Sequence, residues 1–167
     1  MSCVVQNQDS CVKGKIAQRW YYERVAPALE DAFEQFYRKT GRRYGFVDAY
    51  RCEDADYILV GIGCYMETAQ TTVDFLRQQR GIKAGCLNVY CFRPFPSQPI
   101  VDALKNSVAF TVIERMDDPL STTGNHLTRE IKAAFCDAAT GQNGLEPIDR
   151  IPRIYSGAAG LGSRDVR

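Results

Sequence analysis

Short runs of apolar residues mark predicted strands in the C-terminal two thirds of the chain. Three of them, near residues 57–62, 84–90 and 108–113, are almost continuously apolar. Such a run is typical of a strand whose two sides are both covered by other parts of the fold. A shorter run near residues 153–156 predicts a further strand at the edge of the sheet.

Between these runs, apolar residues recur at spacings of three and four, which predicts helices. The helices are predicted to begin near Met66, at Ser97 as N-cap, and at Thr122 or Thr123. Strands that alternate with helices form a parallel sheet with helices on both faces. The predicted fold class is therefore α/β, a three-layer α/β/α arrangement with a mostly parallel sheet. The helices are defined by Met66, Ala69, Val73, Leu76, Ile100, Val101, Leu104, Leu127, Ile131, Ala134, Phe135 and Ala138.

The N-terminal part of the chain carries a weaker pattern. Residues 1–20 have no clear periodicity, which predicts an arm or linker, and residues 21–167 are predicted to form a single domain. A helix is expected early in that domain and should stop at Gly41. Residues 42–55 are expected to be a polar connector. The helix is indicated by Val25, Leu29, Phe33 and Phe36, with Pro27 in its first turn.

The charge balance excludes several classes of partner. Among 167 residues, 21 are basic and 20 acidic, so the formal net charge is +1. No field of one sign is available to hold nucleic acid or an anionic membrane surface. Residues 1–15 are polar, and no run approaches the roughly 20 apolar residues that span a bilayer. We therefore expect a cytoplasmic protein that binds neither nucleic acid nor membrane.

The metal-binding residue types also lack the spacing of a metal site. The sequence has 7 cysteines, and no two of them form a Cys-x-x-Cys pair. This argues against a zinc ribbon or an iron–sulfur cluster inside the chain, and it favours reduced thiols. The single histidine, His126, excludes a site with several histidines and makes a Ser–His or Cys–His catalytic pair improbable. No metal ligand is predicted.

The segment after the first long strand is glycine-rich, as in many nucleotide sites. Gly61, Gly63, Cys64 and Glu67 stand where a strand should turn into a helix. A dinucleotide fingerprint needs a third small residue, and the chain has Met66 there. The segment is predicted to be a strand-to-helix turn, with Glu67 favourable in the first helical turn. No cofactor-binding residue is predicted.

Two further segments are candidates for an interface. Arg93, Pro94 and Phe95 follow a strand at the sheet edge where ligands bind in open α/β folds, so the loop could serve as an interface, a ligand site or a plain loop. The two prolines in residues 91–96 stiffen it, which favours the interface. Leu161 lies in a glycine-rich tail suited to close turns over another surface. We predict Arg93, Pro94, Phe95 and Leu161 as interface residues and no catalytic residue.

A set of short motifs in this order resembles a known family. They are Gln6-Asn7-Gln8-Asp9, Thr40-Gly41-Arg42-Arg43-Tyr44, Glu53-Asp54-Ala55-Asp56-Tyr57, Gly63 with Glu67-Thr68, Arg93-Pro94-Phe95, Glu114-Arg115 and Gly160-Leu161-Gly162-Ser163-Arg164-Asp165. Together they resemble domain II of the pyruvate:ferredoxin (flavodoxin) oxidoreductases, a domain similar to the transketolase C-terminal domain. The resemblance covers nearly the whole chain.

The resemblance implies an enzyme of anaerobic metabolism that oxidatively decarboxylates a 2-oxo acid, with pyruvate as the expected substrate, to an acyl-CoA. Such an enzyme uses thiamine diphosphate with Mg, and electrons pass through 4Fe–4S clusters to ferredoxin or flavodoxin. The cofactors belong to other domains of the family, so none is expected in this chain. The implied role is structural: the domain supports the thiamine-diphosphate-binding domains and the homodimer, and is inactive alone. Two alternatives remain, a free-standing anion-binding regulatory module and a separately encoded interaction subunit of a split oxidoreductase.

Overall fold

The computed structural model describes residues 7–162. The chain divides into two compact units, residues 1–45 and residues 46–167, and each unit is described by itself. The last residues of the predicted tail motif, Ser163 to Asp165, lie outside the described residues.

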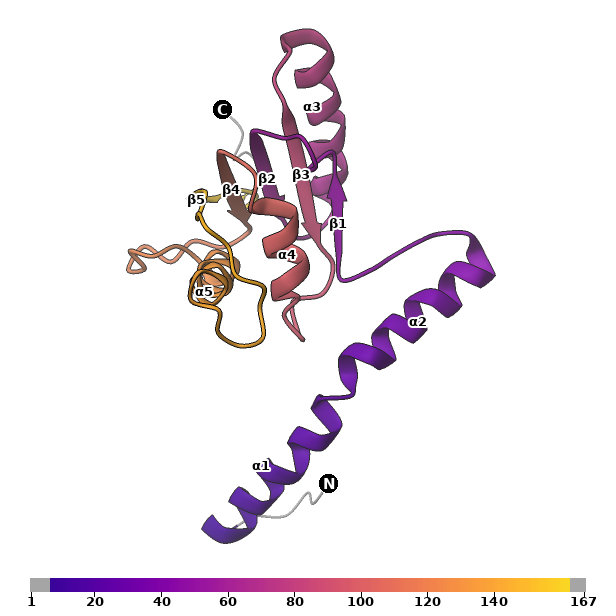
Figure 1. Cartoon of the computed structure of the whole chain (residues 1–167), viewed down its shortest axis with the longest axis vertical. Helices are drawn as coiled ribbons and strands as arrows, with labels where there is room; N and C mark the ends of the chain where they lie inside the picture. The colour runs from indigo at the N-terminus through magenta and orange to yellow at the C-terminus, as the bar shows by residue number, and fades with distance from the viewer. Residues whose placement is uncertain (1–6, 163–167) are drawn as a thin grey trace. The chain divides into compact units, whose positions relative to one another are not determined.

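Two helices make up the described part of the first unit. Helix α1 spans Gln8–Tyr22 and helix α2 spans Val25–Thr40 (Figure 1). The prediction of α2 is confirmed, and Gly41 ends it with a φ of +72°, a backbone angle that glycine adopts without strain. Most of the described part of the predicted arm or linker, residues 1–20, lies in helix α1. Helix α1 buries no residue, although Val12, Ile16 and Trp20 recur at a spacing of four along it.

A five-stranded sheet forms the centre of the second unit, in the order β1-β3-β2-β4-β5. The strands are β1 Val47–Tyr50, β2 Tyr57–Gly61, β3 Ala84–Val89, β4 Ala109–Glu114 and β5 Arg153–Ala158. Strand β1 is antiparallel to β3, and the other neighbours pair in parallel. The four strands predicted from the apolar runs are confirmed, with β5 at the edge.

Strand β1 corrects the prediction of a polar connector over residues 42–55. Its four residues are half-buried or exposed rather than continuously apolar. The strand forms because Val47 to Tyr50 pair with Cys86 to Val89 of β3. A long-range pairing of this kind leaves little local signal in the sequence.

Three helices cover the sheet, and each was predicted from its apolar positions. Helix α3 spans Tyr65–Arg80, α4 spans Ser97–Leu104 and α5 spans His126–Thr140. Figure 1 shows α4 and α5 on one side of the sheet, and α3 lies on the other. The layers are α/β/α over a mostly parallel sheet, the transketolase C-terminal-like arrangement that the resemblance implied.

Two helix starts differ from their predictions. Pro96, not Ser97, occupies the N-cap position of α4, and no side chain caps that helix start. Helix α5 begins at His126 rather than near Thr122, because Asn125 is tied into the preceding loop. Its Oδ1 accepts a bond from the Asp118 amide at 3.1 Å, and its Nδ2 donates to the Met116 carbonyl at 2.7 Å.

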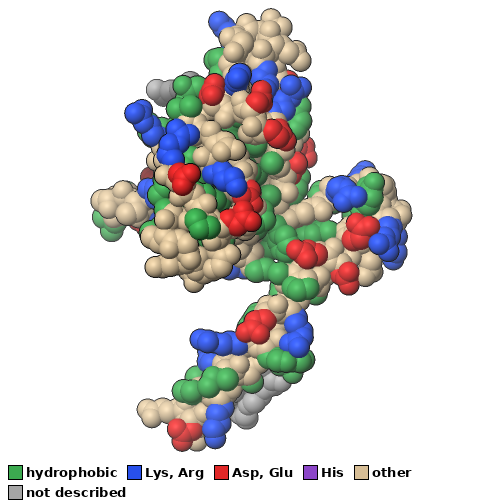
Figure 2. All heavy atoms as spheres, in the orientation of Figure 1, with side chains coloured by type: hydrophobic (Ala, Val, Ile, Leu, Met, Phe, Trp, Pro, Cys, Tyr) green, Lys and Arg blue, Asp and Glu red, His purple; other side chains and the backbone are tan. Residues whose placement is uncertain are grey.

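The main core lies between the sheet and helices α4 and α5. Its largest fully buried side chains include Phe110 of β4 and Phe135 of α5, whose ring centroids are 5.5 Å apart. A smaller core under α3 contains Met66, Ala69 and Val73. On the surface, Figure 2 shows acidic and basic side chains interspersed over the visible face of this unit.

Phe110→Ala should lower the free energy of unfolding by about 3–5 kcal/mol, because it leaves a cavity in the main core. Phe75→Ala is the control, since Phe75 is 51% exposed, and its effect should stay within about 0.5 kcal/mol. Urea denaturation followed by circular dichroism measures both. Equal effects of the two substitutions would contradict the position assigned to the core.

Candidate functional site

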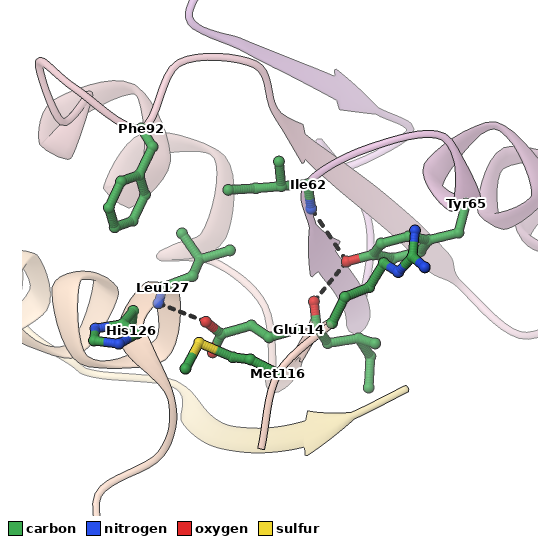
Figure 3. Close-up of a pocket in the computed structure, with 9 residues that line it drawn as sticks. Ile62, Tyr65, Phe92, Glu114, Met116, His126 and Leu127 are labelled. Carbon is green, nitrogen blue, oxygen red and sulfur yellow. Dashed lines mark hydrogen bonds between the residues drawn. The ribbon is translucent and has the colours of Figure 1, made fainter. Parts of the chain in front are cut away.

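The carboxyl edge of the sheet contains a pocket between β2 and β4. After β2 the chain continues into α3 on one face, and after β4 it leads to α5 on the other face. A crevice forms where neighbouring parallel strands send their connections to opposite faces, and ligands of α/β proteins bind in such crevices. The pocket has a volume of about 310 Å³ (Figure 3).

Tyr65, the first residue of α3, lines this pocket. Its hydroxyl accepts a hydrogen bond from the Ile62 amide at 3.1 Å and donates one to the Ile113 carbonyl at 2.6 Å (Figure 3). The hydroxyl therefore connects the end of β2 to the end of β4. Burial raises the pKa of Tyr65, so the phenol stays protonated and keeps its donor.

Gly61 leaves room for that tyrosine. A Cβ at Gly61 would overlap the Tyr65 hydroxyl. Two residues later, Gly63 has a φ of +108°, a backbone angle that L side chains rarely adopt. The predicted turn residues Gly61, Gly63, Cys64 and Glu67 thus lie between β2 and the first turn of α3. Cys64 and Glu67 are exposed, and none of the four lines the pocket.

Glu114, at the end of β4, is only 8% exposed and caps helix α5. Its carboxylate accepts bonds from the Leu127 amide at 2.7 Å, the Thr128 amide at 3.1 Å and the Thr128 hydroxyl at 2.8 Å (Figure 3). A helix N-terminus attracts anions because its first amides lack partners within the helix. Here Glu114 is that anion, so the helix start is already neutralised.

This role of Glu114 did not follow from the sequence. The Glu114 carboxylate bonds to α5, 13 and 14 residues further along the chain. The neighbouring Arg115 Nε donates to the Gly160 carbonyl at 3.2 Å. The adjacent carboxylates of Asp117 and Asp118 do not line the pocket. No local motif signals a cap that comes from a distant strand.

The remaining lining of the pocket is mainly apolar. The exceptions are Arg115 and His126, whose Nδ1 lies 3.0 Å from an Arg129 nitrogen. The lining residues do not include a nucleophile paired with a base. The one carboxylate of the lining, that of Glu114, is bonded to helix α5. The arrangement suits an apolar side chain better than a reacting substrate. The apolar lining residues are Ile62, Phe92, Ile113, Met116 and Leu127.

The predicted interface loop lies close to this pocket through Phe92. Arg93 is exposed, lies over the Phe92 ring with its guanidinium carbon 4.3 Å from the centroid, and donates to Glu130 of α5 at 2.6 Å. Phe95 is half-buried against the main core, and its ring meets that of Phe92 edge to face at 6.0 Å. Pro94 is half-buried. Leu161, in the tail, is 57% exposed.

The cysteines in the part of the chain that the structure describes are free thiols. Cys52 and Cys86 are buried, and burial raises their pKa values to about 12 and about 11. Both therefore stay protonated and unreactive near neutral pH. Cys11, Cys64 and Cys136 are exposed.

Residues 7–162 contain no cluster of three or more His, Cys, Asp or Glu side chains that could hold a metal ion. None of the helices formed by these residues is long and apolar enough to cross a bilayer.

Comparison with known proteins identifies this type of domain. Residues 55–158 match the family described as pyruvate:ferredoxin oxidoreductase core domain II. The matched segment runs from the residues before β2 to the end of β5 and so contains the whole pocket. The chain belongs to this family.

Similar proteins carry related names. The pyruvate synthase subunit PorA of Methanothermobacter thermautotrophicus is 33% identical over 144 residues, which are 86% of this chain and 33% of the relative. The PorA subunit of Thermotoga maritima is 30% identical over 145 residues, which are 87% of this chain and 33% of the relative. A pyruvate-flavodoxin oxidoreductase of Nostoc sp. is 30% identical over 164 residues, which are 96% of this chain and 14% of the relative. The chain thus spans a third or less of these relatives.

Glu114→Gln should lower the free energy of unfolding by about 1–3 kcal/mol, because it removes the charge that caps α5 and leaves one of the buried donors poorly paired. Asp117→Asn is the matched control, an exposed carboxylate on the same loop whose loss should change stability by less than about 0.5 kcal/mol. Urea denaturation measures both variants. If the two substitutions had the same small effect, the cap would not stabilise the fold.

Proposed function

We propose that this chain is a non-catalytic structural domain of a 2-oxo acid oxidoreductase that acts on pyruvate and reduces ferredoxin or flavodoxin. One observation carries the proposal. At the sheet edge where a ligand would bind, the Glu114 carboxylate is engaged by α5 and the Tyr65 hydroxyl by the backbone. What remains is a largely apolar pocket, which can hold a side chain of a neighbouring domain.

The chemistry of the oxidoreductase would then belong to its other domains or subunits. These would bind thiamine diphosphate with Mg, carry the 4Fe–4S clusters and accept CoA. Family membership supports this division, as does the short span of the chain against relatives named as whole oxidoreductases or as subunits. The domain would support the thiamine-diphosphate-binding domains and the homodimer in the cytoplasm.

The contact with those domains would use the Arg93-Pro94-Phe95 loop and the tail around Leu161. Leu161 supplies an exposed apolar side chain, and Arg93 an exposed guanidinium that already faces the carboxylate of Glu130. Phe95 contributes only its exposed part, since the rest packs on the main core. An apolar anchor beside an arginine is a common composition for the centre of an interface.

The pure chain, given pyruvate, CoA, thiamine diphosphate and Mg, should not reduce methyl viologen. The reason is that no side-chain cluster suited to a catalytic metal or cluster lies within residues 7–162. The positive control is a complete pyruvate-flavodoxin oxidoreductase under the same conditions. Viologen reduction by the chain alone would refute the proposal, and saturable binding of pyrophosphate would favour an anion-binding module instead.

In the full-length protein that carries this domain, Leu161→Glu should weaken the dimer while each assembled active site keeps its turnover. A buried unpaired carboxylate destabilises an apolar contact. Leu120→Glu is the control, because Leu120 is 91% exposed in another loop. Sedimentation measures the dimer and viologen reduction the turnover. A loss of turnover in an intact dimer would place the tail at the active site.

A further inference from the structure

The loop after helix α5 contains an asparagine followed by a glycine in a tight turn. Asn143 has a φ of +54° and Gly144 a φ of +73°. The Leu145 amide donates to the Gln142 carbonyl at 3.1 Å across them. Two positive φ angles closed by such a bond define a type I′ turn, for which Asn-Gly is a preferred pair.

This turn is held to the helix by a single side-chain bond. The Asn143 Nδ2 donates to the Asp137 Oδ2 at 2.8 Å, and Asp137 lies in the last turn of α5. Gln142, Asn143 and Gly144 are all exposed. Exposed backbone with few buried contacts opens locally at a much lower free energy than the core. We therefore expect the turn to open while the rest of the domain stays folded.

We propose that Asn143 is a site of spontaneous deamidation, and that opening of the turn controls the reaction. The Gly144 backbone nitrogen attacks the Asn143 Cγ, so an N–Cγ bond forms and the Cγ–Nδ2 bond breaks. The proton of the Gly144 amide passes through solvent to Nδ2, which leaves as ammonia. Water then opens the resulting cyclic imide at either carbonyl and leaves aspartate or isoaspartate at this position.

The attack depends on the conformation of the turn. Gly144 has no Cβ, so its nitrogen can be approached closely once the chain is free to rotate. In a closed type I′ turn the first central residue has a ψ of about +30°. At that angle its side chain and the next backbone nitrogen point away from each other, which keeps the Asn143 Cγ out of reach. The bond to Asp137 therefore slows the reaction, because it helps to keep the turn closed.

The structure distinguishes Asn143 from two other asparagines. Asn106 is also exposed, but the next residue, Ser107, is buried and its amide donates to the Leu104 carbonyl at 3.0 Å. Asn125 is only 5% exposed, and both ends of its side-chain amide are hydrogen-bonded. Asn106 thus provides a control for Asn143 within the same molecule.

Deamidation should loosen the loop that follows α5. Leu145 and Ile148 pack against the main core just after the turn. Isoaspartate adds a carbon to the backbone, so the bond between residues 142 and 145 cannot keep its geometry. Either product also places a second carboxylate beside Asp137, and like charges repel. None of these residues lines the pocket at the carboxyl edge, so the site does not depend on the proposed function.

Ageing of the pure full chain at mildly alkaline pH, followed by peptide mapping with mass spectrometry, tests the proposal. Deamidation at Asn143 should be about tenfold or more faster than at Asn106 in the same sample, because only the first turn opens readily. The same chain unfolded in urea should react faster at Asn143, since its turn is then open. Asp137→Ala should speed the reaction in the folded chain about threefold, because it removes the bond to the helix.

Asn143→Gly is the matched variant, because glycine suits the positive φ and has no amide to lose. Hydrogen exchange over residues 142–148 should become faster as the unmodified chain ages and stay constant in this variant. Absence of deamidation at Asn143, or equal rates at Asn143 and Asn106, would overturn the proposal. Equal rates in the folded and the unfolded chain would overturn control by the turn. Viologen reduction by the chain would refute the proposed function and leave these results unchanged.

Discussion

The carboxylate of Glu114 joins the end of β4 to the start of α5, and the carboxyl edge of the sheet is built around it. Because two amides and a hydroxyl of α5 donate to this carboxylate, the place where the helix start could bind an anion is already occupied. Tyr65 closes the β2 side of the same crevice with one donor and one acceptor bond. The fold thus keeps the position of an α/β ligand site but uses its polar groups internally.

This constraint bears on the proposed structural role. The family is that of pyruvate:ferredoxin oxidoreductase core domain II, and the chain spans a third or less of the relatives named above. Apolar and aromatic groups remain at the carboxyl edge and in the tail. Engaged polar groups at the carboxyl edge and partly uncovered apolar groups support the proposed role in assembly.

Much of the fold followed from local patterns, because buried strands and amphipathic helices have a strong period. The apolar runs of β2, β3 and β4 and the stripes of α2 to α5 are of this kind. What the sequence did not reveal was either exposed or long-range. Helix α1 buries nothing, β1 depends on its pairing with β3, and Glu114 reaches α5 across a loop. The predicted interface residues all lie in loops or in the tail, but Phe95 is partly buried against the main core.

Amide hydrogen exchange, compared between the isolated chain and its assembly with the oxidoreductase domains or subunits proposed as its partners, tests the central claim most directly. A structural domain should gain protection on assembly around Phe92 to Phe95 and around Gly160 to Gly162, while the Leu127 and Thr128 amides held by Glu114 are slow in both states. Unchanged exchange at the loop and the tail, together with new protection of the Leu127 and Thr128 amides on addition of substrate or cofactor, would contradict the account and indicate a ligand site at the carboxyl edge.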